Sequence, residues 1–355
     1  MLLDGLFLPL STPFYPDGRL NLRKLEHNVD RYSKTPAAGF AVLSEAGDAS
    51  LLTDEETREA LKSAMEAAAI EKVMLAGVSR DSVFATLELA GYSAALGYDA
   101  VLVGLPKVLQ TAAGVADEMI VKETLAYFQT VADQSPLPLV MVSSAAGQIA
   151  MKIVIELAGH AKVLGVMEGA GDAVTISALK ASTAFVKREA TVTHVFAAVT
   201  GRMLTQRDTT AGATFISLDT LTEGATALAV APPKPMLKTR TKQVGFQILA
   251  GTTTRMLGAL RAGATGVVPA FAASAPQGCY EVLAAWKDDD QPLAEEKQAR
   301  IEVAAARIEG ELGSAGIRYG CDLNGYYGGR PRLPLLPVTG EQRTEIESLM
   351  RAIRN

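Results

Sequence analysis

Four acidic residues follow the ends of short apolar runs, and their side chains are well suited to chemistry. They are Glu45, Asp48, Glu168 and Asp172. If the runs are parallel strands of one barrel, their carboxyl ends share one face, where the four carboxylates could converge. Carboxylate oxygens are ligands for hard divalent cations, and a bound cation can stabilise an enolate. One hypothesis is therefore a cation-assisted site at that face.

The histidines and serines add no support for a metal site or a nucleophilic site. The three histidines are His27, His160 and His194, and no His-x-His or Glu-x-x-His spacing occurs. Zinc and similar metals need such clustered ligands. Ser143 and Ser144 follow an apolar run, but no histidine is placed to activate them. We therefore expect no metal site and no cofactor.

The apolar pattern predicts the elements that would position these side chains. Eight short apolar runs alternate with segments of helical periodicity, which is typical of parallel strands buried on both faces and wrapped by helices. We predict the α/β class and a (β/α)8 TIM barrel, whose chemistry would lie at the C-terminal ends of the strands. The predicted strands are 7–10, 40–43, 73–76, 100–103, 139–142, 163–166, 246–250 and 266–269.

Spacing and caps also predict several helices. Thr53 with Glu56, and Thr339 with Gln342, have the spacing of capping boxes at helix N-termini. The apolar faces of two further helices are predicted from residues three or four positions apart. These faces are Leu22, Leu25, Val29 and Tyr32 in one helix, and Val83, Leu87, Ala90 and Ala94 in the other.

The length of the chain exceeds what one barrel needs. The chain has 355 residues, of which 48% are hydrophobic, whereas a barrel takes about 250 residues. We expect a barrel over residues 1–290, with an insertion at about 189–243 between the sixth and seventh strands, and a C-terminal helical extension over 291–355. Helix-to-strand connections lie at the N-terminal face of a barrel, so the insertion is expected to form a strand-rich packing or oligomer surface there.

Composition limits the partners of the chain. The net charge of −5 gives no basic surface, so nucleic-acid binding is not expected. No apolar run approaches the ~20 residues of a membrane helix, so no membrane partner is expected. Cys279 and Cys321 are too few for a disulfide framework, and we interpret them as buried thiols in a reduced compartment. A cytoplasmic protein with a small-molecule ligand is the expectation.

Several motifs occur in the order found in a known family. The sequence reads P-L-S-T-P-F at 9–14, S-E-A-G-D at 44–48, L-T-D-E-E at 52–56, G-Y-D-A-V-L-V at 97–103, L-P-L-V-M-V-S at 137–143 and V-L-G-V-M-E-G-A at 163–170. In this order the motifs resemble the dihydrodipicolinate synthase and N-acetylneuraminate lyase family. The resemblance covers nearly the whole chain and implies a class I aldolase-type barrel.

The sequence departs from this family at the residues that carry its chemistry, and these departures imply that the chemistry has been lost. Members form a Schiff base between pyruvate and a lysine in a G-I-K-[DE] strand, and Met167 stands at that position. A thioether cannot form an imine. Val142 stands at the position of the proton-relaying tyrosine, and Glu45 and Ala46 stand where hydroxyl residues hold the carboxylate of pyruvate. The catalytic residue is therefore unknown.

The resemblance further suggests which residues surround a ligand. It places six residues at the mouth and implies a homo-oligomer, either a dimer or a tetramer. In members of the family, the counterparts of Glu168 and Asp172 help to fix a loop. The predicted binding residues are Ser44, Glu45, Ala46, Ser143, Glu168 and Gly251.

Three hypotheses follow from these residues. In the first, the chain is a pseudoenzyme that has lost lyase and aldolase activity and binds an unknown small metabolite. In the second, it is an active lyase that uses a metal or Lys107, which follows the fourth strand beside apolar Val108 and Leu109. In the third, it is a structural or interaction protein. We favour the first hypothesis because the lysine, the tyrosine and the carboxylate-binding threonines are absent together.

Overall fold

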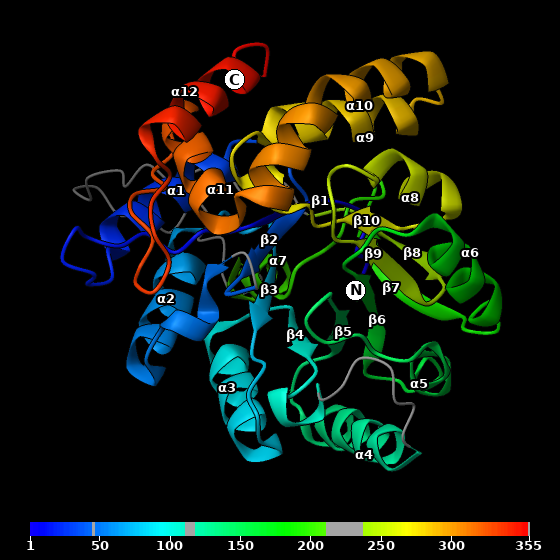
Figure 1. Ribbon diagram of the computed structural model, residues 1–355. Coiled ribbons are helices and arrows are strands. Elements are labelled where there is room, and N and C mark those ends of the chain that lie inside the picture. Colours follow the sequence, from blue (N-terminus) through cyan, green and yellow to red (C-terminus); the bar gives the residue numbers. More distant parts are fainter. Residues whose placement is uncertain (45–46, 111–117, 211–236, 354–355) are drawn as a thin grey trace, which may run out of the picture.

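Eight parallel strands form a closed barrel with helices around it (Figure 1). The computed structural model describes residues 1–44, 47–110, 118–210 and 237–353. The strand order is β1-β10-β9-β6-β5-β4-β3-β2, so the predicted (β/α)8 barrel is confirmed. The barrel strands are β1 (Gly5–Pro9), β2 (Gly39–Val42), β3 (Val73–Gly77), β4 (Ala100–Gly104), β5 (Leu139–Ser143), β6 (Val163–Glu168), β9 (Gln247–Ala250) and β10 (Gly266–Val267).

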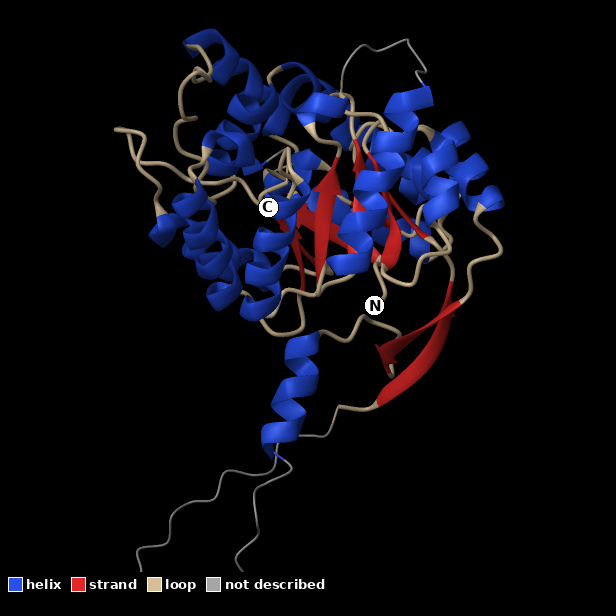
Figure 2. Cartoon of the chain, turned by 90° about the horizontal axis from the view of Figure 1, so that it is seen from below, coloured by secondary structure: helices blue, strands red, loops and turns tan. Residues whose placement is uncertain are grey.

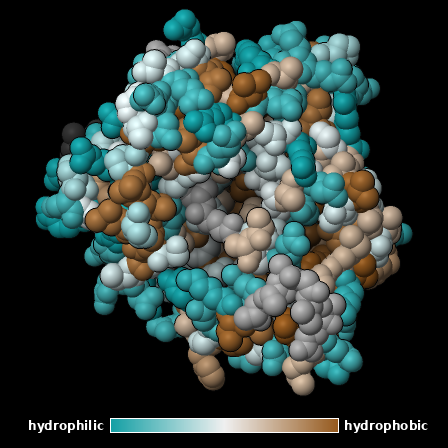
Figure 3. Space-filling model, in the orientation of Figure 1, coloured by the Kyte–Doolittle hydropathy of each residue, from teal (hydrophilic) through white to brown (hydrophobic). Residues whose placement is uncertain are grey.

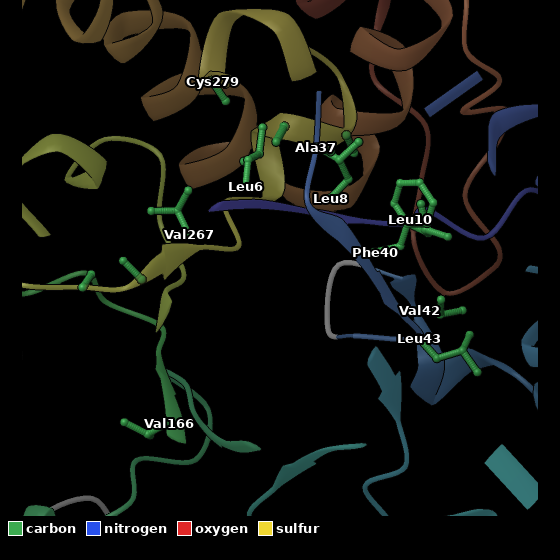
Figure 4. Packing of buried hydrophobic residues seen from close by; sticks show 14 of the residues in the cluster. Leu6, Leu8, Leu10, Ala37, Phe40, Val42, Leu43, Val166, Val267 and Cys279 are labelled. Atoms are coloured by element: carbon green, nitrogen blue, oxygen red, sulfur yellow. The ribbon is translucent and has the colours of Figure 1, made fainter. Parts of the chain in front are cut away.

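The strand residues alternate between two apolar layers because successive side chains point to opposite faces of a strand. Leu6, Leu8 and Phe40 belong to the outer layer between strands and helices (Figure 4). Phe7 lies between Leu6 and Leu8 in the chain and belongs to the layer inside the barrel. This alternation determines which side chain of each strand can face the mouth of the barrel.

The helices confirm the cap predictions. Both predicted capping boxes are present, at Thr53 with Glu56 and at Thr339 with Gln342. The 3-10 turns η2 (Ala49–Leu51), η3 (Lys107–Leu109) and η5 (Ala270–Ala273) follow β2, β4 and β10. The barrel helices are α1 (Leu22–Ser33), α2 (Asp54–Ala67), α3 (Val83–Leu96), α4 (Glu118–Gln134), α5 (Met151–Leu157), α6 (Ala173–Ser182), α8 (Met256–Ala262) and α9 (Pro276–Lys287).

The buried face of α3 differs from the predicted one. Its fully buried residues are Thr86, Leu89, Ala90 and Ser93, whereas Val83 and Leu87 only pack against the edge of the core. Thr86 and Ser93 are tolerated inside because their hydroxyls have hydrogen-bonding partners. The Thr86 hydroxyl lies 3.1 Å from the Tyr127 hydroxyl, and Ser93 donates to its own helix over 2.8 Å.

The insertion between β6 and β9 covers the N-terminal face of the barrel (Figure 2). It contains an antiparallel two-stranded sheet of β7 (Arg188–Thr193) and β8 (Thr239–Val244), and α7 (Gly201–Thr210) lies between these strands in the chain. Arg188 donates to the backbone oxygen of Val163 over 2.6 Å, and the amide of Gly201 donates to Asp99 over 2.9 Å. Both acceptors lie at the beginning of barrel strands. The face predicted for the insertion is confirmed, whereas residues 211–216 and 231–235 lie outside the described residues.

The C-terminal extension consists of α10 (Gln291–Ala305), a π-helical turn η6 (Ala306–Glu311), α11 (Gly313–Leu323) and α12 (Gly340–Met350). In Figure 1 it lies beside α1 and α9. Cys279 and Cys321 are both free and buried, as predicted, and burial raises the pKa of Cys321 to about 11. Within the described part of the chain, no helix is both long and apolar enough to cross a membrane.

Candidate functional site

The C-terminal ends of β2 to β6 surround a cavity of about 500 Å³ at the barrel mouth. Figure 3 shows the surface hollowed near the centre of this face. The volume falls within the usual range of small-molecule sites. The lining residues that concern its chemistry are Leu43, Ser44, Asp54, Ser79, Arg80, Asp81, Leu102, Lys107, Gln110, Val142, Ser144 and Met167.

Three apolar side chains line the cavity from inside the barrel. Leu102, Val142 and Met167 all belong to the interior layer and all line the cavity. Met167 is aligned with Val142 of β5 on one side and with Leu249 of β9 on the other. Met167 is 8% exposed and Val142 is 7% exposed. Neither side chain carries a nitrogen or oxygen atom, so this part of the cavity cannot supply an amine or a proton relay.

Arg80 gives the rim a guanidinium that the sequence analysis did not identify. It follows β3 and donates to the Thr57 hydroxyl over 3.2 Å and to Asp54 over 3.4 Å. Its neighbour Ser79 accepts a hydrogen bond of 2.7 Å from the amide of Gly104. The sequence signal that could have identified Arg80 was the polar triplet Ser79, Arg80 and Asp81, which closely follows the third apolar run. Strand ends supply the residues of barrel sites.

Lys107 lies beside this triplet, on the loop after the neighbouring strand β4. Its backbone amide donates to Asp81 over 2.8 Å, which joins the loops that follow β3 and β4. The Lys107 side chain is exposed, and the adjacent Val108 is 67% exposed. The burial beside Val108 and Leu109 that a reactive Lys107 would need is therefore not found. Lys107 lines the cavity as a solvated cation.

The loop after β2 has an unusual backbone. Leu43 and Asp48 have φ values of 55° and 54°, in a region that non-glycine residues seldom adopt. The Ser44 hydroxyl is buried and has no hydrogen-bond partner among the residues that the structure describes. Glu45 and Ala46, both predicted binding residues, lie outside those residues. Strained residues and an unpaired hydroxyl at a cavity favour a ligand-binding role for this loop.

A buried ion pair fixes the end of the same loop. Asp48 is 6% exposed and contacts Arg318 of α11, which is 1% exposed. Arg318 also donates to the backbone oxygens of Thr12 and Gly328, over 2.7 Å each. The C-terminal extension thus reaches the mouth, and Asp48 is engaged by an arginine instead of being free to bind a cation.

The other two acids fix the loop after β6. Glu168 accepts hydrogen bonds from the amides of Ala170 and Asp172, over 3.3 Å and 2.9 Å. Asp172 caps α6 by accepting from the hydroxyl and the amide of Thr175, and these bonds lower the pKa of Asp172. The hypothesis that these acids converge with Asp48 is wrong, because Glu168 and Asp172 bind their own loop and helix whereas Asp48 is paired with Arg318. Among the described residues, no group of three or more His, Cys, Asp or Glu could hold a metal ion.

The geometry of the barrel can now be compared with known proteins. The model of the dihydrodipicolinate synthetase family matches residues 2–187 and 228–353. The chain belongs to this family. It is 23% identical over 350 residues to the 4-hydroxy-tetrahydrodipicolinate synthase of Exiguobacterium sp. (strain ATCC BAA-1283 / AT1b), a match that covers 98% of this chain and 96% of that protein.

Two further comparisons show how far the likeness extends. The 4-hydroxy-tetrahydrodipicolinate synthase of Stenotrophomonas maltophilia (strain R551-3) is 32% identical over 185 residues, which cover 51% of this chain and only 59% of that protein. A crystal structure of dihydrodipicolinate synthase from Bacillus anthracis superposes with a TM-score of 0.75 and 17% identity, covering 100% of both chains. At that identity the superposition shows the fold alone.

The predicted binding residues are divided between the cavity and its surroundings. Ser44 lines the cavity, whereas Ser143, Glu168 and Gly251 are not among the lining residues. Ser143 accepts a hydrogen bond of 3.0 Å from the amide of Ile149. The amide of Gly251 donates to the backbone oxygen of Glu168 over 2.9 Å, and a Cβ at Gly251 would lie 2.8 Å from Gly169. These residues shape the loops around the cavity.

Proposed function

We propose that this member of the dihydrodipicolinate synthetase family binds a small metabolite at the barrel mouth and has lost Schiff-base chemistry there. The observation that carries the proposal is the side chain of Met167, which faces inward and lines the cavity. The resemblance of the sequence motifs assigns the family's lysine to this position. Covalent carbonyl chemistry needs a free amine, and a thioether cannot supply one. The same cavity retains the volume needed to enclose a metabolite.

The lining favours a ligand with an apolar body and a polar end. Leu102, Val142 and Met167 offer only apolar contact. The rim carries two cations, Arg80 and Lys107, and the two acids Asp54 and Asp81. Among the described residues the rim charges therefore cancel, unlike the cationic rim that a strongly anionic ligand would require. A polar or zwitterionic group on the ligand best matches this rim.

Borohydride trapping tests the loss of the Schiff base. Incubation with pyruvate and borohydride should leave no adduct on any peptide that contains residues 163–172, because Met167 has no amine. Peptide mass mapping is the measurement, and a family member that carries the lysine serves as the positive control. An adduct on Lys107 that disappears in Lys107→Gln would support the alternative of an active lyase and contradict the proposal.

Native mass spectrometry after incubation with a metabolite extract tests ligand binding. The wild-type protein should retain a small molecule, whereas Met167→Trp should not, because the larger side chain fills part of the cavity. Met167→Leu, which conserves the apolar character and approximate volume, is the matched control and should retain the molecule. Equal retention by the Trp variant would contradict binding at the mouth. Absence of any bound molecule would favour a structural role.

We also propose that the chain forms a cytoplasmic homo-oligomer, either a dimer or a tetramer. Members of this family are typically oligomeric, and a large surface insertion offers additional contact area. Sedimentation velocity should therefore give a mass of two or four times 37.3 kDa. A single species with the mass of one chain at micromolar concentration would contradict the proposal.

A further inference from the structure

A second cavity, of about 340 Å³, lies between the segment after β1 and the C-terminal helices. It shares no residue with the cavity at the barrel mouth. Its walls come from the loop before α1, from α11, from the loop between α11 and α12, and from α12. The lining residues are Phe14, Pro16, Ala315, Tyr319, Asp322, Tyr327, Gly329, Arg330, Pro331, Pro337, Val338 and Arg343.

Two exposed arginines of this cavity are available to a ligand. Within the described part of the chain, neither Arg330 nor Arg343 makes an ion pair or donates a side-chain hydrogen bond. Arg343 lies against the ring of Tyr319, with its guanidinium carbon 5.5 Å from the ring centroid. Burial raises the pKa of Asp322, and the charge of Arg343 acts to lower it. By contrast, the nearby Arg318 and Arg332 are paired with Asp48 and Glu56. Of these four arginines, the two without an ion pair are the two that line the cavity.

The single carboxylate among the lining residues accepts hydrogen bonds from backbone amides. Asp322 accepts hydrogen bonds from the amides of Gly328 and Gly329, over 2.9 Å and 3.4 Å. Two guanidinium groups and one carboxylate give the lining a net charge of +1. Lys24 adds a cation at the edge, with its ammonium nitrogen 5.0 Å from the ring centroid of Tyr327. Glu347, which accepts a hydrogen bond of 2.5 Å from the Tyr319 hydroxyl, offsets the charge of Lys24. The lining together with these two edge residues keeps a net charge of +1, which favours an anion.

The remaining walls are aromatic or apolar. Tyr319 and Tyr327 contribute partly exposed rings, and Pro331 and Pro337 contribute apolar ring edges. Phe14 is only 1% exposed and lies beneath Arg318 and Arg332, so it forms the floor of the cavity. Aromatic walls favour a planar apolar body, whereas guanidinium groups match the two oxygens of a carboxylate or phosphate. We infer that this cavity is a second binding site, which takes a small ligand with an oxyanion on a planar apolar body.

Calorimetric titration with benzoate and phenyl phosphate tests the site and distinguishes a carboxylate from a phosphate. At least one of the two should bind saturably, and phenol and inorganic phosphate, which each lack one half of the ligand, should bind more weakly. Arg330→Gln and Arg343→Gln should each weaken binding about tenfold, since each removes a charge-assisted hydrogen bond. Arg351→Gln, at an exposed arginine near the end of α12, is the matched control and should bind as the wild type does.

The barrel mouth must be excluded as the source of any signal. Met167→Trp, which fills part of the mouth cavity, should leave the affinity for the aryl anions unchanged. Loss of binding in Met167→Trp but not in the Arg330 and Arg343 variants would place the ligand at the mouth and overturn the inference. Absence of saturable binding by both aryl anions would also overturn it. Inorganic phosphate binding as tightly as phenyl phosphate would rule out recognition of the planar body.

Discussion

Replacing Arg318 with Met should destabilise the protein by about 3–5 kcal/mol, because it leaves the buried carboxylate of Asp48 without its cation. The two side chains are 1% and 6% exposed, so water cannot replace the lost partner without opening the structure. After the substitution, Asp48 keeps only the Ser314 hydroxyl, at 3.0 Å, among its described side-chain partners. Chemical denaturation followed by circular dichroism measures the loss as a lower midpoint with a similar slope.

Two further variants separate the buried charge from general damage to α11. Arg351→Met removes an exposed arginine and should change stability by no more than about 0.5 kcal/mol. The double variant Arg318→Met, Asp48→Asn removes the uncompensated charge and should recover part of the loss. If Arg318→Met alone were as stable as the wild-type protein, the ion pair would not be what holds the loop after β2.

The barrel could be predicted because its strands are buried on both faces. Such strands appear in a sequence as continuous apolar runs, and all eight predicted runs overlap the observed strands. The prediction was wrong where burial does not follow hydrophobicity. Thr86 and Ser93 of α3 are fully buried because their hydroxyls are hydrogen-bonded, and an apolar pattern cannot reveal such partners.

The candidate site was less predictable because side-chain partners come from distant parts of the chain. Asp48 is paired with a residue 270 positions away, and nothing local in the sequence indicates that contact. The position of Met167 was easier to predict, since a residue at the C-terminal end of a barrel strand must lie near the mouth. Arg80 could have been identified by the same rule, because it follows the third strand as Lys107 follows the fourth.

Restoring the lysine alone should not restore pyruvate chemistry. In Met167→Lys the new amine would lie among the apolar residues Val142, Leu102 and Leu249, and burial there favours its neutral, nucleophilic form. If Glu45 lies where the family resemblance assigns it, at the carboxylate of pyruvate, its charge would act in the opposite direction and would also repel that carboxylate. The adjacent Val142 cannot move a proton, and proton transfer is needed to form and release an imine.

A variant that restores all four residues of the family's site makes this prediction quantitative. Met167→Lys combined with Val142→Tyr, Glu45→Thr and Ala46→Thr should be trapped by pyruvate and borohydride at least about 100-fold faster than Met167→Lys, because acid–base catalysis alone contributes that much. Met167→Gln, which is polar but not nucleophilic, is the matched control and should give no adduct.

The reason for expecting so large a difference is that residues that act together are strongly non-additive. An amine that lacks both a proton relay and a carboxylate-binding loop recovers only a small part of the rate that all four residues give together. If Met167→Lys alone turned over pyruvate as fast as the variant with all four substitutions, then Val142, Glu45 and Ala46 would be irrelevant to the chemistry. The mouth would in that case have lost a single group, and the proposed divergence of the whole site would be wrong.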